Sequence, residues 1–316
     1  MEHLKKEAFS CKGVEQMELD SLLTKATQYG EKTVAVAAAE DEEVLEAVAE
    51  AIKLNLASFL LFGDEEKIHQ LIKEKHSGIA DSQKLKIIHA ESASLSAESA
   101  VRAVKEQKAN VLMKGNIPTA GILKAVLNKE YGLRTGNVLS HVAVFEVPGF
   151  DRLTIVTDAA MNIAPDLNQK AQIVKNAVEI ARGIGIEKPL VAPVAAVEVV
   201  NPAMQATLDA AALTLMSKRG QIKDCVVDGP LALDNAISFE AAEHKGIKSE
   251  VAGQADILLV PTIEVGNTLY KSLVYFAKAK VGAVIAGAKA PIVLTSRADS
   301  AESKVYSLAL AICSAK

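Results

Sequence analysis

Ser296 and Arg297, near the carboxyl end of the chain, are the residues best suited to chemistry by type and position. Residues 291–294 before them are a short apolar run typical of a buried strand, and Asp299 with Glu302 indicates a helix start. A helix amino terminus favours anions, and arginine offers a planar set of donors that matches phosphate. The pattern predicts an anion site with a hydroxyl beside it, although simple helix capping and a solvated arginine would explain the same residues.

A second strand-to-helix turn carries Lys114, Gly115, Asn116 and Thr119. Glycine permits a close backbone approach, and Asn116 or Thr119 could donate a hydrogen bond to an oxyanion. The turn is not a Walker loop, and no GxGxxG follows a predicted strand. We expect these four residues to bind substrate, while a purely structural turn remains an equally good interpretation.

Two further turns place polar residues where a strand leads into a helix. Asp158 and Asn162 stand in an otherwise apolar loop, and Gly266 stands directly before a predicted helix that starts at Asn267. Gly266 could adopt a positive φ and Asn267 could cap that helix. We expect all four to line a binding site, with turn formation by Asp158 and capping by Asn267 as the alternatives.

Arg134 and His141 lie where the rhythm of the predicted elements changes. Arg134 is our second candidate for a phosphate ligand, whereas we assign His141 to the core or the surface. The six histidines show no metal-binding spacing, so we expect no metal, and the absence of a GxSxG motif argues against an acyl-serine hydrolase.

The order of elements indicates an α/β protein with two domains. From residue 33 to 128, strands alternate regularly with helices, which predicts a parallel, doubly wound sheet. Two strands at 138–147 and 153–157, joined through Pro148 and Gly149, then predict an antiparallel hairpin. We expect a first domain of residues 1–131 plus 285–316, an inserted second domain of residues 132–284, and an active site in the cleft between them.

Composition narrows the classes of function. The net charge of −4 argues against nucleic acid as the main partner, and no apolar run is long enough to span a membrane. Cys11, Cys225 and Cys313 form no CxxC motif. They are interpreted as small core residues of a protein in a reducing cytoplasm.

With these turns in view, nearly the whole chain from about residue 14 resembles the phosphate acetyl/butyryltransferase family, and its butyryltransferase branch most of all. The resemblance implies the two-domain isocitrate/isopropylmalate dehydrogenase-like architecture, with an interdomain cleft. It also implies reversible acyl transfer between coenzyme A and phosphate, with coenzyme A as a substrate and no bound cofactor or metal, in a homo-oligomer. Its most specific parts are the segments 113–116, 157–165, 227–230, 266–271 and 290–297.

The resemblance also suggests roles for the residues at the last turn. It makes Arg297 the phosphate ligand and Ser296 a donor to the reacting carbonyl or phosphate. The acetyl branch has a catalytic Asp seven residues after that serine, where this chain has Ser303, so we take Asp299, one helical turn earlier, as the base. The alternatives are Glu302, Asp158, and no protein base, with phosphate dianion assisting.

The chain is therefore expected to transfer a short acyl group, butyryl in particular, from coenzyme A to phosphate by direct attack in a ternary complex. The expected partners are acyl-CoA, phosphate and acyl phosphate. The alternatives are a nicotinamide-dependent hydroxy-acid dehydrogenase of the same architecture and a non-catalytic acyl-CoA-binding protein.

Overall fold

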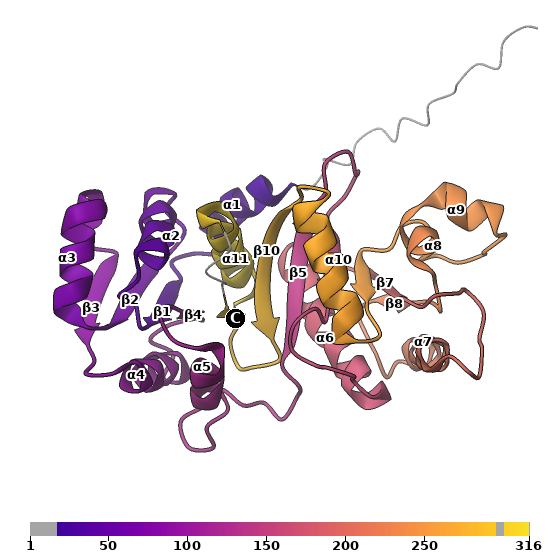
Figure 1. Cartoon of the computed structure of the whole chain (residues 1–316), viewed down its shortest axis with the longest axis horizontal. Helices are drawn as coiled ribbons and strands as arrows, with labels where there is room; N and C mark the ends of the chain where they lie inside the picture. The colour runs from indigo at the N-terminus through magenta and orange to yellow at the C-terminus, as the bar shows by residue number, and fades with distance from the viewer. Residues whose placement is uncertain (1–17, 295–299, 316) are drawn as a thin grey trace, which may run out of the picture.

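A computed structural model describes residues 18–294 and 300–315. These residues form one eleven-stranded mixed sheet with helices on both faces (Figure 1), which confirms the α/β class. The strands are β1 (Thr33–Ala37), β2 (Ser58–Gly63), β3 (Leu85–His89), β4 (Val111–Lys114), β5 (Ser140–Glu146), β6 (Thr154–Thr157), β7 (Leu190–Pro193), β8 (Val226–Val227), β9 (Ile257–Leu259), β10 (Lys280–Ala286) and β11 (Ile292–Val293). Their order in the sheet is β3-β2-β1-β4-β11-β10-β5-β6-β9-β7-β8.

Helices connect most of these strands. They are α1 (Leu19–Gln28), α2 (Glu42–Lys53), α3 (Glu65–Lys75), α4 (Ala93–Lys105), α5 (Thr119–Val126), α6 (Leu167–Gly183), α7 (Gln205–Lys218), α8 (Leu233–Ile237), α9 (Phe239–His244), α10 (Ile263–Tyr275) and α11 (Ala301–Ser314), with a 3₁₀ turn at Ser77–Ile79. Side-chain caps start several of them: Asp41, Asp64 and Ser92 each accept a hydrogen bond from a backbone N–H of the first turn.

The amino-terminal strands follow the predicted topology. β3, β2, β1 and β4 pair in parallel, with α2 and α3 on one face of the sheet and α4 and α5 on the other (Figure 1). Each strand-to-helix turn in this region therefore opens at the same edge of the sheet, as in other doubly wound folds.

The middle of the sheet is where the pairing changes. β5 and β6 form the predicted antiparallel hairpin, and β10 pairs antiparallel with β5. The chain then returns to the amino-terminal strands, so that β11 pairs in parallel with β4. The two predicted regions share one continuous sheet, and residues 284 and 285 both lie within β10.

The two faces of this sheet are covered differently. Alternate residues of β10 point to opposite faces of the sheet. On one face, Val284 and Ala286 belong to a single core that spans the sheet. On the opposite face, Ile285 belongs to a core under α4 and α5. Val281 and the half-buried Ala283 pack with a separate core under α8, α9 and α10. That face therefore has a gap between two helix layers, above β10.

Two helices start at residues other than those predicted. α10 begins at Ile263 with Thr262 as its N-cap, so Asn267 lies inside the helix and does not cap it. The N-cap of α11 is Ser300, whose side chain accepts from the Ser303 N–H, while Asp299 lies outside the described residues. The short helices α8 and α9 were not predicted, because one or two turns carry too little periodicity.

The described helices include none that is long and apolar enough to cross a membrane. Cys225 and Cys313 are buried, and burial raises the pKa of each thiol to about 11. Both thiols are therefore protonated and unreactive at neutral pH, which agrees with their predicted place in the core.

Candidate active site

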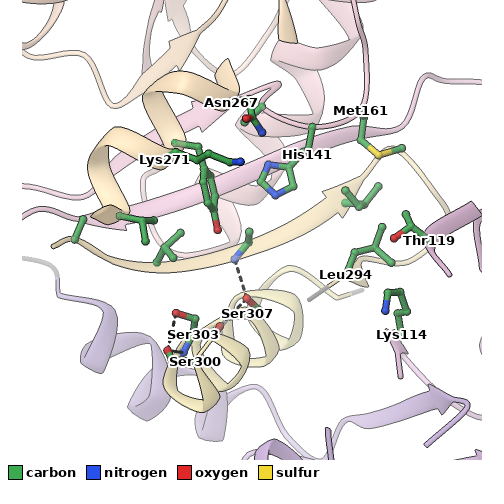
Figure 2. Close-up of a pocket in the computed structure, with 18 of the residues that line it drawn as sticks. Lys114, Thr119, His141, Met161, Asn267, Lys271, Leu294, Ser300, Ser303 and Ser307 are labelled. Carbon is green, nitrogen blue, oxygen red and sulfur yellow. Dashed lines mark hydrogen bonds between the residues drawn. The ribbon is translucent and has the colours of Figure 1, made fainter. Parts of the chain in front are cut away.

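A pocket of about 1040 Å³ fills the gap above β10, between α5 and α10 (Figure 2). Its floor consists of Val281, Ala283 and Ile285, which point to the same side of β10. His141 of β5 lies directly opposite Ile285 in the register and lines the pocket too. The pocket therefore runs along β10, which spans roughly 20 Å at the rise of an extended strand.

One edge of β10 is only partly covered by a strand. β11 meets β10 at the single pair Ile285 and Ile292, and α11 packs beside the rest. Ser307 of α11 accepts a hydrogen bond of 2.9 Å from the Ala283 N–H, which satisfies one donor on that open edge (Figure 2). Ser300 and Ser303, at the start of α11, also line the pocket.

The pocket has an apolar end. Ile117, Met161 and Leu294 line it there with Ile285, and all four belong to or pack against the core under α4 and α5. Figure 2 shows Met161, Thr119 and Leu294 gathered at this end, with Lys114 just below. This end is suited to a short hydrocarbon chain.

The other end of the pocket is cationic. Lys271 and Lys278 are exposed on its rim, and neither makes an ion pair within the described part of the chain. Lys280, at the beginning of β10, is bonded at 3.0 Å to Asp20 and lies 3.6 Å from Glu146. The exposed ring of Tyr275 lines the same end.

Asp158 holds the loop that forms one wall. Its buried carboxylate accepts hydrogen bonds from the backbone N–H groups of His141, Ala160, Met161 and Asn162, and from the Asn162 side chain at 2.5 Å. The Asn162 amide also donates to the Leu139 carbonyl at 2.8 Å. Both side chains thus fix the backbone of the pocket wall, and Asp158 itself does not line the pocket.

His141 is a titratable group of the pocket whose pKa is shifted by its surroundings. Burial lowers the pKa of its imidazole, and the nearby Asp158 carboxylate partly opposes that shift, so the ring is neutral at pH 7. Nδ1 is buried and has no hydrogen-bond partner in the part of the chain that the structure describes. The ring packs edge-on against Tyr270 at 5.8 Å. An unpaired buried nitrogen costs about 1–3 kcal/mol, so its presence needs an explanation.

The Lys114–Thr119 turn reaches the pocket through its two ends. Lys114 and Thr119 line the pocket, and the Lys114 ammonium donates to the Gly115 carbonyl at 3.0 Å. The N–H groups of Gly115 and Asn116 instead donate to the carbonyls of Ala37 and Ala38. A Cβ at Gly115 would lie 2.1 Å from the carbonyl oxygen of Ala38. The glycine therefore allows the backbone at Ala38 to pack closely against this turn.

Gly266 does not adopt the positive φ expected from the sequence. It lies within α10, where a Cβ would come 2.7 Å from the Asp158 carbonyl oxygen. The glycine lets α10 approach the Asp158 loop closely and directs the next residue, Asn267, into the pocket.

The remaining predicted residues lie elsewhere. Arg134 is exposed and does not line the pocket. Ser296, Arg297 and Asp299 lie outside the described residues, although the residues that flank that segment, Leu294 and Ser300, both line the pocket.

Several lining residues were not selected from the sequence. These are Met161, Tyr270 and Lys271, which fall in segments that carry the resemblance but were given no role, and Lys278 and Lys280, which fall in none. A signal existed for two of them, since Tyr270 and Lys271 stand one helical turn after Gly266 and Asn267. Among residues 18–294 and 300–315, no three His, Cys, Asp or Glu side chains come together as a metal site.

Relatives of this chain indicate the class of enzyme to which the sheet and its two-ended pocket belong. Residues 90–312 match the family model described as Phosphate acetyl/butaryl transferase. The chain is 59% identical over 300 residues to a Bacillus subtilis protein named "Probable phosphate butyryltransferase", covering 95% of this chain and 99% of that one. It is 52% identical over 292 residues to the phosphate butyryltransferase of Clostridium beijerinckii, covering 92% and 96%.

Solved structures agree. The branched-chain phosphotransacylase of Enterococcus faecalis V583 superimposes with a TM-score of 0.78 at 38% identity, over 90% of this chain and 98% of that one. The 4-hydroxythreonine-4-phosphate dehydrogenase of Klebsiella pneumoniae shares the fold alone, with a TM-score of 0.52 at 12% identity over 90% and 100%. This chain belongs to the phosphate acetyl/butyryltransferase family and is an acyltransferase.

Proposed function

We propose that this enzyme transfers a short acyl group, butyryl in particular, between coenzyme A and inorganic phosphate, by direct attack in a ternary complex. The observation that carries the proposal is the pocket along β10, which is apolar at one end and lysine-rimmed at the other. The high identity to proteins named for butyryl transfer supports the choice of acyl group.

The two ends of the pocket suggest how acyl-CoA lies. The phosphates of coenzyme A are expected at Lys271 and Lys278, and the adenine ring can stack on Tyr275. The pantetheine arm then follows β10, whose free edge and small side chains leave room for an extended chain. The acyl group reaches the apolar end beside Met161 and Leu294.

The predicted site residues fit this arrangement as parts of one proposal. Arg297 binds phosphate and Ser296 donates to the reacting carbonyl or to phosphate, because their segment begins directly after Leu294. Lys114 and Thr119 face the same end, next to Gly115 and Asn116. Asn267 lines the wall, and Gly266, Asp158 and Asn162 shape it.

Arg134 is proposed to contact phosphate only if its segment moves towards the pocket. The division into residues 1–131 plus 285–316 and residues 132–284 would make the pocket an interdomain cleft. A cytoplasmic homo-oligomer that needs no bound cofactor or metal completes the proposal.

Thiol release from acetyl-, propionyl-, butyryl- and isobutyryl-CoA, with and without phosphate, tests the proposed function. We expect phosphate-dependent thiol release with the highest kcat/KM for butyryl-CoA, each methylene contributing about 1–3 kcal/mol to discrimination. An absence of phosphate-dependent thiol with every substrate would contradict acyl transfer. A preference for acetyl-CoA would contradict only the butyryl assignment.

A further inference from the structure

His141 lines the pocket and, among the described residues, has an unpaired buried nitrogen, and the proposed function has not yet given it a role. Its imidazole lines the pocket among apolar neighbours, opposite Ile285 and against the edge of Tyr270. Figure 2 shows the ring between α10 and β10, close to the middle of the pocket. A neutral imidazole can accept a proton at one nitrogen, and Nε2 lies at the tip of the ring, away from the buried Nδ1.

The position of His141 is fixed on both sides. Its backbone N–H donates to the Asp158 carboxylate at 3.2 Å, and its carbonyl accepts from the Thr157 hydroxyl at 2.9 Å. The strand pairing with β10 adds a further constraint. These bonds fix the backbone of His141, and the edge-on contact with Tyr270 restricts the ring.

Of the carboxylates considered as the base, Asp158 and Glu302 are already engaged, whereas Asp299 lies outside the described residues. Asp158 uses its two oxygens on five donors, and Glu302 accepts from the Tyr306 hydroxyl at 3.1 Å. Ser303 occupies the place where the resemblance would put an aspartate. The thiol of coenzyme A, with a pKa of about 8.5, still needs a proton acceptor at neutral pH.

We propose that His141 is a catalytic residue whose imidazole takes the proton from the thiol of coenzyme A as the sulfur attacks the acyl phosphate. The inference rests on the proposed acyl transfer. As the sulfur–carbon bond forms, the thiol proton passes to Nε2. The bond between the acyl carbon and the phosphate oxygen then breaks, and the departing phosphate takes the proton from the imidazolium. In the reverse direction the imidazole relays the proton of HPO₄²⁻ to the departing thiolate.

The charged groups around the ring suit this role. Asp158 lies behind it on the β6 side and favours the transient imidazolium. Tyr270 packs against it from α10 and Ile285 lies opposite it on β10, while Lys271 and Glu302 line the pocket from α10 and α11. Burial keeps the resting ring neutral, so the enzyme holds the base in its active form at neutral pH.

The test compares His141→Gln with wild type, using butyryl phosphate and coenzyme A from about pH 5.5 to 9.5. Glutamine keeps a polar side chain but cannot carry the proton. We expect kcat to fall about 100-fold at neutral pH, with the Kd for butyryl-CoA and the KM for butyryl phosphate within about threefold of wild type. The deficit should shrink about tenfold per pH unit as the thiol ionises unaided towards its pKa of about 8.5.

His89→Gln is the matched control, because His89 is exposed on β3 far from the pocket, and its profile should match wild type. An unchanged kcat, or a deficit equal at every pH, would overturn the assignment. If His141→Gln does not fold, His141→Asn is measured over the same pH range, and a kcat deficit that is absent or equal at every pH again overturns the assignment. Wild-type protein without thiol turnover would instead contradict the proposed function itself.

Discussion

At the scale of single residues, polar side chains next to the pocket divide into those that face it and those that build it. Lys114, Thr119 and Asn267 face it, whereas Asp158 and Asn162 direct their polar atoms into the loop behind it. The sequence alone does not distinguish the two groups, because a polar residue after a strand suits a binding site and a turn equally well. The distinction depends on which N–H groups the folded backbone brings to each carboxylate.

Asp158→Ala is expected to destabilise the protein by at least about 3 kcal/mol, because it leaves several buried N–H groups without an acceptor. Urea unfolding at neutral pH measures the change. Asp151→Ala is the control and should cost less than about 1 kcal/mol, since Asp151 is an exposed loop residue that, within the described residues, forms an ion pair with Arg152. A stable Asp158→Ala protein that has lost activity would show that the carboxylate acts on substrate instead.

At the scale of elements, most strands and helices could be predicted within a few residues. The parallel pairing of β3, β2, β1 and β4 follows from the alternation over residues 33–128, and the hairpin of β5 and β6 follows from the Pro148–Gly149 joint. The start of α10 could not be placed, because Gly266 and Asn267 carry a turn-like composition inside a helix. That composition reflects a close contact with another segment, which spacing along the chain does not reveal.

Gly266→Ala and Gly121→Ala should change stability in different ways, although both glycines are helical. Alanine in a helix ordinarily stabilises by about 1 kcal/mol. At Gly266 the new methyl group would meet the Asp158 backbone, so we expect a net loss of about 1–3 kcal/mol.

At Gly121, in α5, the nearest atoms are Cδ1 and Cγ1 of the Ile117 side chain at 3.1 Å and no backbone atom of the other described segments is as close, so we expect no loss or a small gain. Thermal and urea unfolding of both variants provide the measurement. Equal effects would argue against close packing of α10 on the Asp158 loop.

At the scale of the whole molecule, the pocket exists because one face of the sheet carries two separate cores. The alternation along β10 assigns Ile285 to one core and Val281 to the other. No local sequence pattern predicts these two cores, since the pairing of β10 with β5 joins segments more than 130 residues apart. The same pairing brings His141 into the pocket, and for that reason the sequence alone assigned it to the core or surface.

The lysine-rimmed end can be tested through charge. Replacing both Lys271 and Lys278 by alanine should raise the KM for butyryl-CoA roughly tenfold, at about 0.5–1 kcal/mol for each exposed lysine. The KM for butyryl phosphate should stay within about twofold, and added salt should reduce the difference.

The control replaces Lys73 and Lys86, which are exposed on α3 and β3 and change the net charge equally. A similar rise in KM for the control would attribute the effect to overall charge. No rise in either protein would place the phosphates of coenzyme A elsewhere.

The pairing of β11 with β4 also has a consequence for biosynthesis. β4 ends at Lys114 and pairs with β1 on one side, but β11, its partner on the other side, begins only at Ile292. One edge of β4 therefore stays unpaired while the ribosome makes the chain between them. At ordinary translation rates this interval is on the order of 10 s or more. An unpaired strand edge is a template for association with other chains. The nascent polypeptide is therefore most vulnerable to aggregation just before the segment that leads into the pocket emerges.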